Sequence, residues 1–306
     1  MAKLYVSSYE NIFVIDGIQQ EVIHTIPIKE GDAKVDATFM TKLQKNDELY
    51  VSNLLGTLKL VDSQGTVTSI PDCDGQGVIT SNQSTNTVYK VNFDEQSMSI
   101  ISASNKQVNK ISLDFSPDSI IVNASNNNVY VSTHQDSNLT VFDENGEKIG
   151  SISLDHNIYG LYKNQKNNLI YAGGPGELSI ISSNEEVKSN VVFNLNTGVK
   201  YITVNNNAID KDKNKITKIY TTDLNGIIAV ISEHFVNNEF EYKILKEETM
   251  YLQQYAIHGM VFDEDSNYIY AIDQASDKVL VIDPSKLNNP IINTISLGSS
   301  AFSIIS

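Results

Sequence analysis

Arginine is absent from this 306-residue sequence, so its 22 basic residues are all lysines, and they stand against 37 Asp and Glu residues for a net charge of −15. Arginine supplies the rigid fork that binds a phosphate or a guanine through two hydrogen bonds at once. An acidic chain without arginine therefore speaks against binding to nucleic acid or to an anionic membrane. The same charge suits a basic partner or a cation, although its plainer role is solubility.

Cysteine is almost absent too, because Cys73 is the only one. A single cysteine allows no intrachain disulfide and no thiolate cage for a metal. Asp72 and Asp74 flank it, and their charges oppose the thiolate that a nucleophile needs. No apolar run approaches the roughly 18 residues of a membrane span, so we expect no membrane insertion.

The first residues give no sign of export. Residues 1–7 pass straight into a strand-like run, without a charged leader followed by a long apolar stretch. We therefore expect a cytoplasmic protein. A secreted or cell-surface location is the alternative, if a signal peptide has been removed.

The sequence is rich in one repeat, an aliphatic residue followed by tyrosine. The repeat tyrosines are 39 to 50 residues apart, and joining the two ends of the chain gives a further step of 41. A chain that holds a whole number of repeats only when its ends are joined is what a closed ring requires. The repeat tyrosines are Tyr5, Tyr50, Tyr89, Tyr130, Tyr171, Tyr220 and Tyr270.

Each repeat contains four strand-like segments. A second apolar run follows the tyrosine strand, as in 139–142, and the Asp or Ser after it can close a turn by bonding its own backbone. A third, alternating run such as 149–154 is typical of a half-exposed outer strand. A fourth run precedes the tyrosine, as in 120–122. Four strands in roughly 40–45 residues is the period of a β-propeller blade.

The two ends of the chain complete each other. The first unit lacks its leading run, because 4–6 is already its second strand, and the missing run stands at the other end as 301–305. Pairing them buries two strand edges that would otherwise attract other chains. We therefore predict an all-β, seven-bladed β-propeller with four-stranded blades, formed by residues 1–306 as a single domain. Its ring is closed by the C-terminal strand completing the first blade, and we expect a monomer.

Individual units also match a known repeat. Residues 122–132 and 138–143 read as a Tyr-Val-Thr-Asn-like strand followed by a Val-x-Val-Ile-Asp-like strand, and 269–297 matches almost throughout. In these segments the chain resembles the YVTN-type propellers. The resemblance covers the whole chain and implies the fold. It says little about function, because such repeats serve binding proteins, cell-surface proteins and enzymes alike.

Ligands of propellers usually meet the loops at one mouth of the central channel. Two connections that lead to inner strands carry a histidine and a tyrosine, which gives His156, Tyr159, Tyr255 and His258 as candidate ligand-binding residues. Histidine can act as an acid or base near neutral pH, and tyrosine offers aromatic surface with a hydroxyl tip. The structural alternative for each histidine is a side chain that lines the channel and binds water or a backbone carbonyl. Because the two connections belong to blades that are not neighbours, an inserted peptide or side chain suits them better than a small ligand.

No catalytic constellation emerges from the sequence. It contains no Gly-x-Ser-x-Gly, Walker or dinucleotide motif, and residues 173–176, Gly-Gly-Pro-Gly, predict a tight turn and not a phosphate cradle. We predict a non-catalytic scaffold that presents loops at one mouth to a protein, peptide or glycan partner, with no catalytic residue, metal ligand or organic cofactor.

The competing hypothesis is a cation-dependent hydrolase or lyase at the channel mouth. The acidic charge and the two histidines support it, together with Asp36, Asn157, Asp223 and Asp273. A cation in the central channel is therefore left open.

Overall fold

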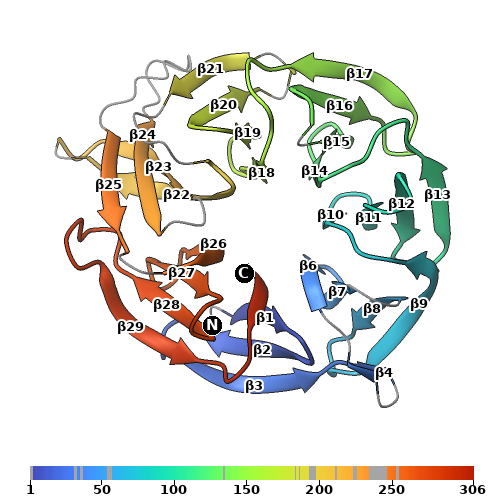
Figure 1. The fold of residues 1–306 in the computed structure, drawn as a ribbon, viewed down its shortest axis with the longest axis horizontal. Helices are drawn as coiled ribbons and strands as arrows, with labels where there is room; N and C mark the ends of the chain where they lie inside the picture. The colour runs from blue at the N-terminus through green and yellow to red at the C-terminus, as the bar shows by residue number, and fades with distance from the viewer. Residues whose placement is uncertain are drawn as a thin grey trace.

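The computed structural model describes residues 3–30, 33–34, 37–53, 57–133, 135–182, 184–185, 187–192, 198–210, 212–222, 226–233, 247–252 and 255–306. Within these residues every regular element is a β-strand, and seven four-stranded antiparallel sheets surround a central opening (Figure 1). The predicted seven-bladed β-propeller is confirmed. None of the described segments forms a helix that could cross a membrane.

Each blade runs from an inner strand at the channel to an outer strand at the rim. Blade 1 contains β30 (Ala301–Ile305), β1 (Lys3–Ser8), β2 (Asn11–Asp16) and β3 (Glu21–Pro27). Blade 2 contains β6 (Ala37–Leu43), β7 (Glu48–Asn53), β8 (Thr57–Val61) and β9 (Val67–Asp74). Blade 3 contains β10 (Ile79–Asn82), β11 (Thr87–Asn92), β12 (Ser97–Ser102) and β13 (Val108–Ser112). Blade 4 contains β14 (Ser119–Asn123), β15 (Asn128–Ser132), β16 (Asn138–Phe142) and β17 (Lys148–Ser153).

The remaining three blades have the same order. Blade 5 contains β18 (Gly160–Lys163), β19 (Ile170–Gly173), β20 (Glu177–Ile181) and β21 (Val187–Val192). Blade 6 contains β22 (Tyr201–Ile209), β23 (Lys215–Thr222), β24 (Ile227–Glu233) and β25 (Glu247–Tyr251). Blade 7 contains β26 (Ile257–Asp263), β27 (Tyr268–Asp273), β28 (Lys278–Ile282) and β29 (Ile291–Ser296). A two-stranded hairpin of β4 (Lys29–Glu30) and β5 (Ala33–Lys34) lies between blades 1 and 2.

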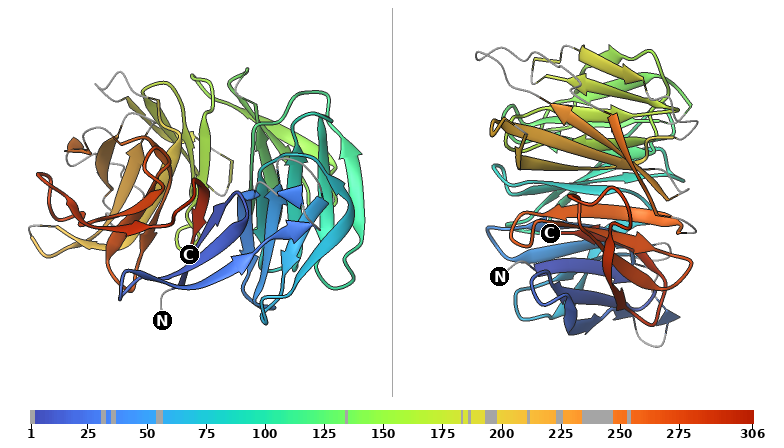
Figure 2. Two further views of the ribbon diagram at one scale, coloured as in Figure 1. Left: turned by 60° about the horizontal axis from the view of Figure 1, so that its bottom comes forward. Right: turned by 90° about the vertical axis from the view of Figure 1, so that its left-hand side faces the viewer.

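The ring closes in blade 1, where strands from the two ends of the chain lie side by side (Figures 1 and 2). β30 pairs antiparallel with β1, and the register sets Tyr5 opposite Ile305 and Val6 opposite Ile304. Ala301 and Ile304 are buried in the core of that blade. The predicted closure by the C-terminal strand is therefore confirmed.

The burial of each strand follows from its place between stacked blades. A middle strand such as β16 is covered on both faces, so Leu139, Val141 and Phe142 are all buried. The outer strand β17 is largely exposed and buries Ile152 alone. The predicted Asp turns are also present, since the Oδ1 atom of Asp143 accepts hydrogen bonds from the backbone N–H groups of residues 145 and 147. The equivalent turns begin at Asp16, Asp62 and Asp283.

The repeat tyrosines join neighbouring blades. Tyr89 donates a hydrogen bond across the interface to the carbonyl of Glu144 in blade 4 at 3.1 Å, and Tyr171 donates to Glu233 in blade 6 at 3.2 Å. Tyr220 stacks on Phe262 of blade 7, with ring centroids 6.1 Å apart. The other hydroxyl contacts to the next blade are Tyr5 with Lys42, Tyr50 with Lys106, Tyr130 with Glu185 and Tyr270 with Gly17. The tyrosine of each sequence repeat thus contacts the next blade of the ring.

Candidate functional site

A cavity of about 350 Å³ lies in the central channel, at the end where the inner strands begin. All seven blades contribute to its wall. Six of the blades contribute an aromatic or imidazole ring, and blade 4 contributes Asp118 and Ser119. The ring-bearing residues, from blade 1 to blade 7, are Phe302, Phe39, Phe93, Tyr159, Tyr201 and His258. We call this cavity and these six residues the aromatic mouth.

Several of these rings lie against one another. Phe39 and Phe93 meet edge to face with centroids 6.4 Å apart, and Tyr201 lies 6.5 Å from His258. Phe302 packs edge to face on Tyr9, at 4.8 Å. Such pairs hold rings in fixed positions. The aromatic mouth is therefore a largely preformed surface.

Local irregularities in the inner strands accompany this arrangement. The pairing register of β6 shifts between Ala37 and Phe39, and that of β26 shifts between Ile257 and Met260, on either side of His258. A β-bulge of this kind re-aims side chains at the rims of closed sheets. Both shifts occur beside residues of the aromatic mouth.

The electrostatics of the mouth centre on His258 and Lys200. Partial burial, followed by the positive charge of Lys200, lowers the pKa of His258, and the carboxylate of Asp273 opposes the shift. Burial and Lys200 thus both favour the neutral imidazole of His258. The Nζ atom of Lys200 lies 5.8 Å from the centroid of the Tyr201 ring, within range of a cation–π interaction.

The four predicted site residues do not all meet. Tyr159 and His258 both line the aromatic mouth. His156 is 6% exposed and lies in the interior of blade 5, with Nδ1 2.9 Å from the carbonyl oxygen of Asn157 and Nε2 2.8 Å from Ser179 Oγ. The contact with a backbone carbonyl agrees with the structural alternative for a histidine, but the ring lies inside the blade and is not among the residues that line the channel cavity.

Tyr255 lies in a different place. It lines a hollow of about 390 Å³ between blades 6 and 7, together with Tyr251, Leu287 and Ile291. The prediction from sequence placed all four residues at the mouth, whereas the structure places two of them there, and Phe39, Phe93, Tyr201 and Phe302 were not predicted. A ligand-binding role for any of the four stays a prediction.

The Gly-Gly-Pro-Gly segment is the predicted tight turn, and it also supports the mouth. A Cβ atom on Gly174 would lie 2.2 Å from the carbonyl oxygen of Asn157 and 2.3 Å from His156 Nδ1. The backbone N–H of Tyr159 donates to the carbonyl of Gly173 at 2.7 Å, and that of Val199 donates to Gly174 at 2.8 Å. Glycine is needed here because two connections approach the turn closely, and they are the connections that lead to Tyr159 and to Tyr201.

The structure describes only some of the residues behind the hydrolase or lyase hypothesis. Asp36 and Asp223 lie outside the described residues. Asp273 is buried, and its carboxylate accepts hydrogen bonds from the backbone N–H of Ala256 and from Ser276 Oγ. In the part of the chain that the structure describes, no three His, Cys, Asp or Glu side chains could together hold a metal ion. This hypothesis stays a prediction.

Cys73 is buried in blade 2. Burial raises the pKa of its thiol, and nearby lysines only partly oppose the shift. Its side chain is therefore a packed thiol.

Comparison with solved structures places the fold among β-propellers of several kinds. Hydrazine synthase from Kuenenia stuttgartiensis is similar at a TM-score of 0.67 and 17% identity, covering 87% of this chain and 88% of that one. A streptogramin B lyase has a TM-score of 0.67 and 14% identity, covering 88% and 86%. The β-propeller domain of Myceliophteria thermophila Cps50 (Swd1) has a TM-score of 0.67 and 9% identity, covering 85% and 87%.

These similarities define the class of protein and no more. The hydrazine synthase, the lyase and the Cps50 β-propeller domain have the same TM-score of 0.67 with this chain, so function has to be argued from the site. No protein-family model matches the sequence, and no curated protein matches it.

Proposed function

We propose that this protein is a non-catalytic binding scaffold whose aromatic mouth receives an apolar or aromatic side chain of a protein or peptide partner. One observation carries the proposal: six blades each contribute a ring-bearing residue to the wall of a single cavity of about 350 Å³. Cavities that bind ligands generally hold about 300–1,000 Å³ and combine apolar walls with a few polar groups. Here the polar groups come from Asp118, Ser119, Lys200 and Ser303, and from the hydroxyls of Tyr159 and Tyr201 and the imidazole of His258.

The composition of the wall favours an inserted side chain. Tyrosine and phenylalanine offer large contact areas and lose little conformational entropy on binding. Complete burial of one Leu, Ile or Phe side chain contributes about 1.5–3 kcal/mol, which corresponds to roughly a tenfold to hundredfold gain in affinity. A glycan would need more hydrogen-bonding partners than these walls offer, so a peptide suits the cavity better.

The charge around the mouth favours a basic partner. The connections on this face of the ring carry many carboxylates, with Lys200 as the opposing charge next to the cavity. Complementary charge accelerates encounter and orients the partner. The described carboxylates on these connections include Glu10, Asp94, Glu95, Asp114, Asp118, Asp136, Asp155 and Asp277. We therefore expect lysine or arginine beside the inserted residue.

The kinship with YVTN-type propellers remains part of this proposal. Its support is the repeat itself, in which the tyrosine strand and the following Val-x-Val-Ile-Asp-like strand recur around the ring. A cytoplasmic, monomeric protein is likewise our proposal.

Selection from a phage-displayed library of random peptides tests the binding function. Panning would use the wild-type protein and the variant Ser119→Phe, in which a benzyl group occupies part of the cavity. The control is Ser151→Phe, the same substitution on the exposed face of outer strand β17. We expect enriched peptides to contain aromatic or large apolar residues flanked by basic ones. Their affinity should fall at least tenfold for Ser119→Phe and stay unchanged for Ser151→Phe.

Two outcomes would contradict this function. One is that enriched peptides bind wild type and Ser119→Phe with equal affinity, which would place their site elsewhere. The other is that panning enriches no peptide above the level of an empty-well control.

A further inference from the structure

A second cavity, of about 370 Å³, lies between blades 5 and 6, at the opposite end of the inner strands from the aromatic mouth. Blade 5 contributes the turn between β18 and β19, and blade 6 contributes β22, β23 and the end of β24. Its polar side chains are Lys166, Asn167, Asn206, Lys215, Thr217 and Glu233. We call this cavity the interblade hollow. Its volume lies within the range of about 300–1,000 Å³ that is usual for ligand sites.

Glu233 is a buried acid in the wall of the interblade hollow, and one of its oxygens is unused. The side chain is 7% exposed. Its Oε2 atom accepts a hydrogen bond from Tyr171 at 3.2 Å, whereas the buried Oε1 atom has no hydrogen-bond partner among the described residues. A buried polar atom without a partner costs free energy, and such atoms are rare in folded proteins. A ligand that donates to Glu233 would remove this cost.

The nearest blade offers little compensating charge to this carboxylate. Burial raises the pKa of Glu233 to about 7, against the hydrogen bond from Tyr171. Lys166 lines the same hollow, but its Nζ atom pairs with Glu264 at 2.6 Å. An ammonium group supplies both a proton donor and a positive charge, and charge-assisted hydrogen bonds are stronger than neutral ones. The chemistry of Glu233 therefore favours an ammonium ligand.

The strand register places a cation near Glu233. β23 and β24 pair with Thr217 opposite Glu233. Side chains two residues apart on a strand share a face, so Lys215 stands on the face of Thr217 and diagonally from Glu233. Such diagonal positions are about 7–8 Å apart. Lys215 is exposed at the start of β23, so its ammonium group can turn toward an anion in the hollow.

Two asparagine amides add donors to the same wall. Asn167 Oδ1 accepts from the backbone N–H of Leu169 at 3.1 Å, which leaves the amide N–H groups to donate. Asn164 Oδ1 accepts from the backbone N–H of Lys166 at 3.0 Å, so its amide nitrogen is the atom that donates to Asn206 Oδ1 at 2.7 Å. The amide oxygen of Asn206 is thus also engaged, and its N–H groups are donors toward an anion.

We propose that the interblade hollow binds a free α-amino acid. The ligand's ammonium group donates to Glu233, and its carboxylate accepts from Lys215, with Asn167 and Asn206 as further donors. An α-amino acid carries both charges on one carbon atom, so a single small molecule can reach both groups. An amine without a carboxylate would leave Lys215 unused, and a sugar would offer no charge to either residue. This site is separate from the aromatic mouth and does not rest on the function proposed for it.

Amide NMR of the full chain tests the site. Protein labelled with ¹⁵N is titrated with the standard L-amino acids, first in pools and then singly, at about pH 7.5, above the pKa of about 7 of Glu233. We expect at least one amino acid to bind with a dissociation constant of about 1 mM or lower. Its binding should shift the amide signals of residues 206, 215, 217 and 233.

Two derivatives of the amino acid that binds test its two charges separately. Acetylation of its nitrogen removes the ammonium group, and amidation removes the carboxylate. Each derivative should bind the wild-type protein about tenfold more weakly or worse, because one charge-assisted hydrogen bond is lost. The protein is the same in both titrations, so this comparison does not depend on the folding of a variant.

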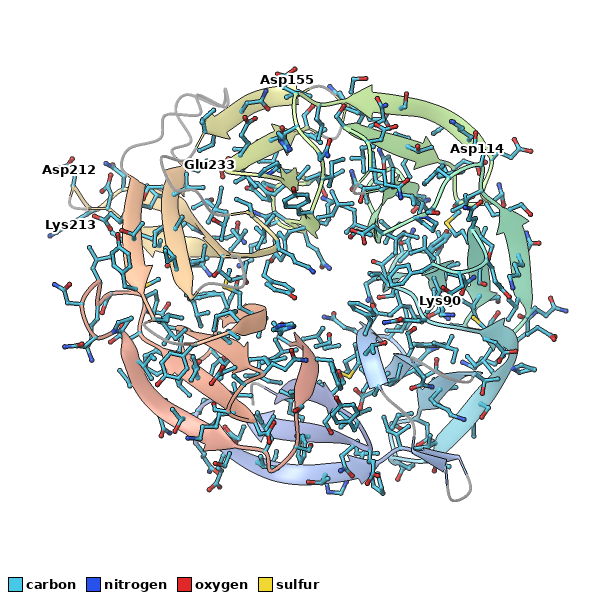
Figure 3. The ribbon with its side chains drawn as sticks, in the orientation of Figure 1. Lys90, Asp114, Asp155, Asp212, Lys213 and Glu233 are labelled. Atoms are coloured by element: carbon cyan, nitrogen blue, oxygen red, sulfur yellow. The ribbon has the colours of Figure 1, made fainter. Side chains whose placement is uncertain are left out.

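Substitutions then test the two charged residues. Glu233→Gln keeps an acceptor for Tyr171 and removes the charge, so binding should weaken about tenfold. Lys215→Met should weaken binding to a smaller extent, because Lys215 is exposed. The matched control is Lys213→Met, which removes an exposed lysine from the neighbouring turn and should leave the affinity unchanged. Figure 3 shows Lys213 at the outer end of blade 6, away from Glu233.

The absence of binding by every standard amino acid at about 10 mM would overturn the proposal. So would equal affinity for the amino acid and its acetylated form, or equal affinity of wild type and Glu233→Gln. None of these titrations uses a displayed peptide. Failure of the binding function of the mouth would therefore appear in the panning experiment alone, and failure of the amino-acid site in these titrations.

Discussion

Glu48 and Glu233 accept the same kind of hydrogen bond from a repeat tyrosine but differ in their other partners. Tyr50 donates to Glu48 Oε2 at 2.9 Å, and Tyr171 donates to Glu233 Oε2 at 3.2 Å. Glu48 also accepts from Lys106 Nζ at 2.8 and 2.9 Å. Among the described residues, the buried Oε1 atom of Glu233 has no hydrogen-bond partner. Figure 3 labels Glu233 at blade 6, near its interface with blade 5.

Because of this difference, the pKa values of the two carboxyl groups shift in opposite directions. Burial raises the pKa of Glu233 from 4.5 to about 7, and the bond from Tyr171 opposes the shift only weakly. Burial also acts on Glu48, but hydrogen bonds from Lys106, Tyr50 and Asn46 outweigh it and hold the pKa of Glu48 below its usual value.

The sign of the effect on stability follows from the direction of the shift. Because the pKa of Glu233 is higher in the folded than in the unfolded protein, the folded state holds this proton more tightly. The resulting stabilisation is complete below the unfolded pKa of 4.5 and is lost as the pH rises through about 7. At about 1.4 kcal/mol per pKa unit, the shift is worth about 3 kcal/mol, of which about 2–3 kcal/mol is lost between about pH 5 and about pH 8.

The substitution Glu233→Gln removes the titrating group and keeps an acceptor for Tyr171. Urea unfolding at a series of pH values, followed by circular dichroism, gives the free energy of unfolding by linear extrapolation. We expect wild type to lose about 2–3 kcal/mol more than Glu233→Gln between about pH 5 and about pH 8.

The matched control Glu48→Gln should behave in the opposite sense. Its stabilisation is present above the usual glutamate pKa and is lost toward acid, so this variant should lose stability at neutral pH and become less sensitive to acid. Parallel pH profiles for wild type and Glu233→Gln would refute the reasoning.

Three further predictions concern the fold and its surface. Gly174→Ala should lower the thermal melting temperature, because its Cβ would lie 2.2 Å from a backbone oxygen, whereas Gly150→Ala, with open space around its Cβ, should not. Deletion of residues 302–306 removes the partner of β1. Each buried apolar side chain contributes about 1.5–3 kcal/mol, so we expect a loss of free energy of unfolding that is large against a typical domain stability of roughly 5–15 kcal/mol. An unchanged melting temperature would contradict this. Fluorescence anisotropy with labelled duplex DNA at physiological salt should show no binding, because the net charge is −15 without any arginine, and measurable affinity would overturn that expectation.

The fold could be read from the sequence because its signals are local and repeated. Each tyrosine strand is a short apolar run with a turn residue at its boundary, and the period of these runs predicts one blade at a time. Closure followed from the leading strand that the first unit lacks and 301–305 supplies. Side-chain contacts across the interfaces were not readable in the same way. Glu233 meets Tyr171 across a separation of 62 residues, and nothing in the local pattern links the two.

The aromatic mouth was only partly predictable, since it depends on which individual side chains face the channel. Side chains alternate along a strand, so a shift by one residue reverses which of them face the channel. Register shifts occur beside Phe39 and around His258, and no alternation in the sequence marks them. His156 was placed at the mouth by its position in a connection. Its ring turns back into blade 5 because Gly174 leaves room for it and Ser179 offers a partner.

The tyrosine contacts give every blade two different sides. One side offers a phenol and the other receives the phenol of the preceding blade, so the interfaces are head-to-tail and all have the same polarity. Such an interface does not by itself fix the number of blades, and a closed ring forms only where the rotation between neighbouring blades adds up to a full turn. Blades of this kind are exchangeable modules. A duplicated blade would carry both the tyrosine and the surface that receives the tyrosine of the preceding blade. The contact that joins neighbouring blades is therefore also compatible with rings of more or fewer blades.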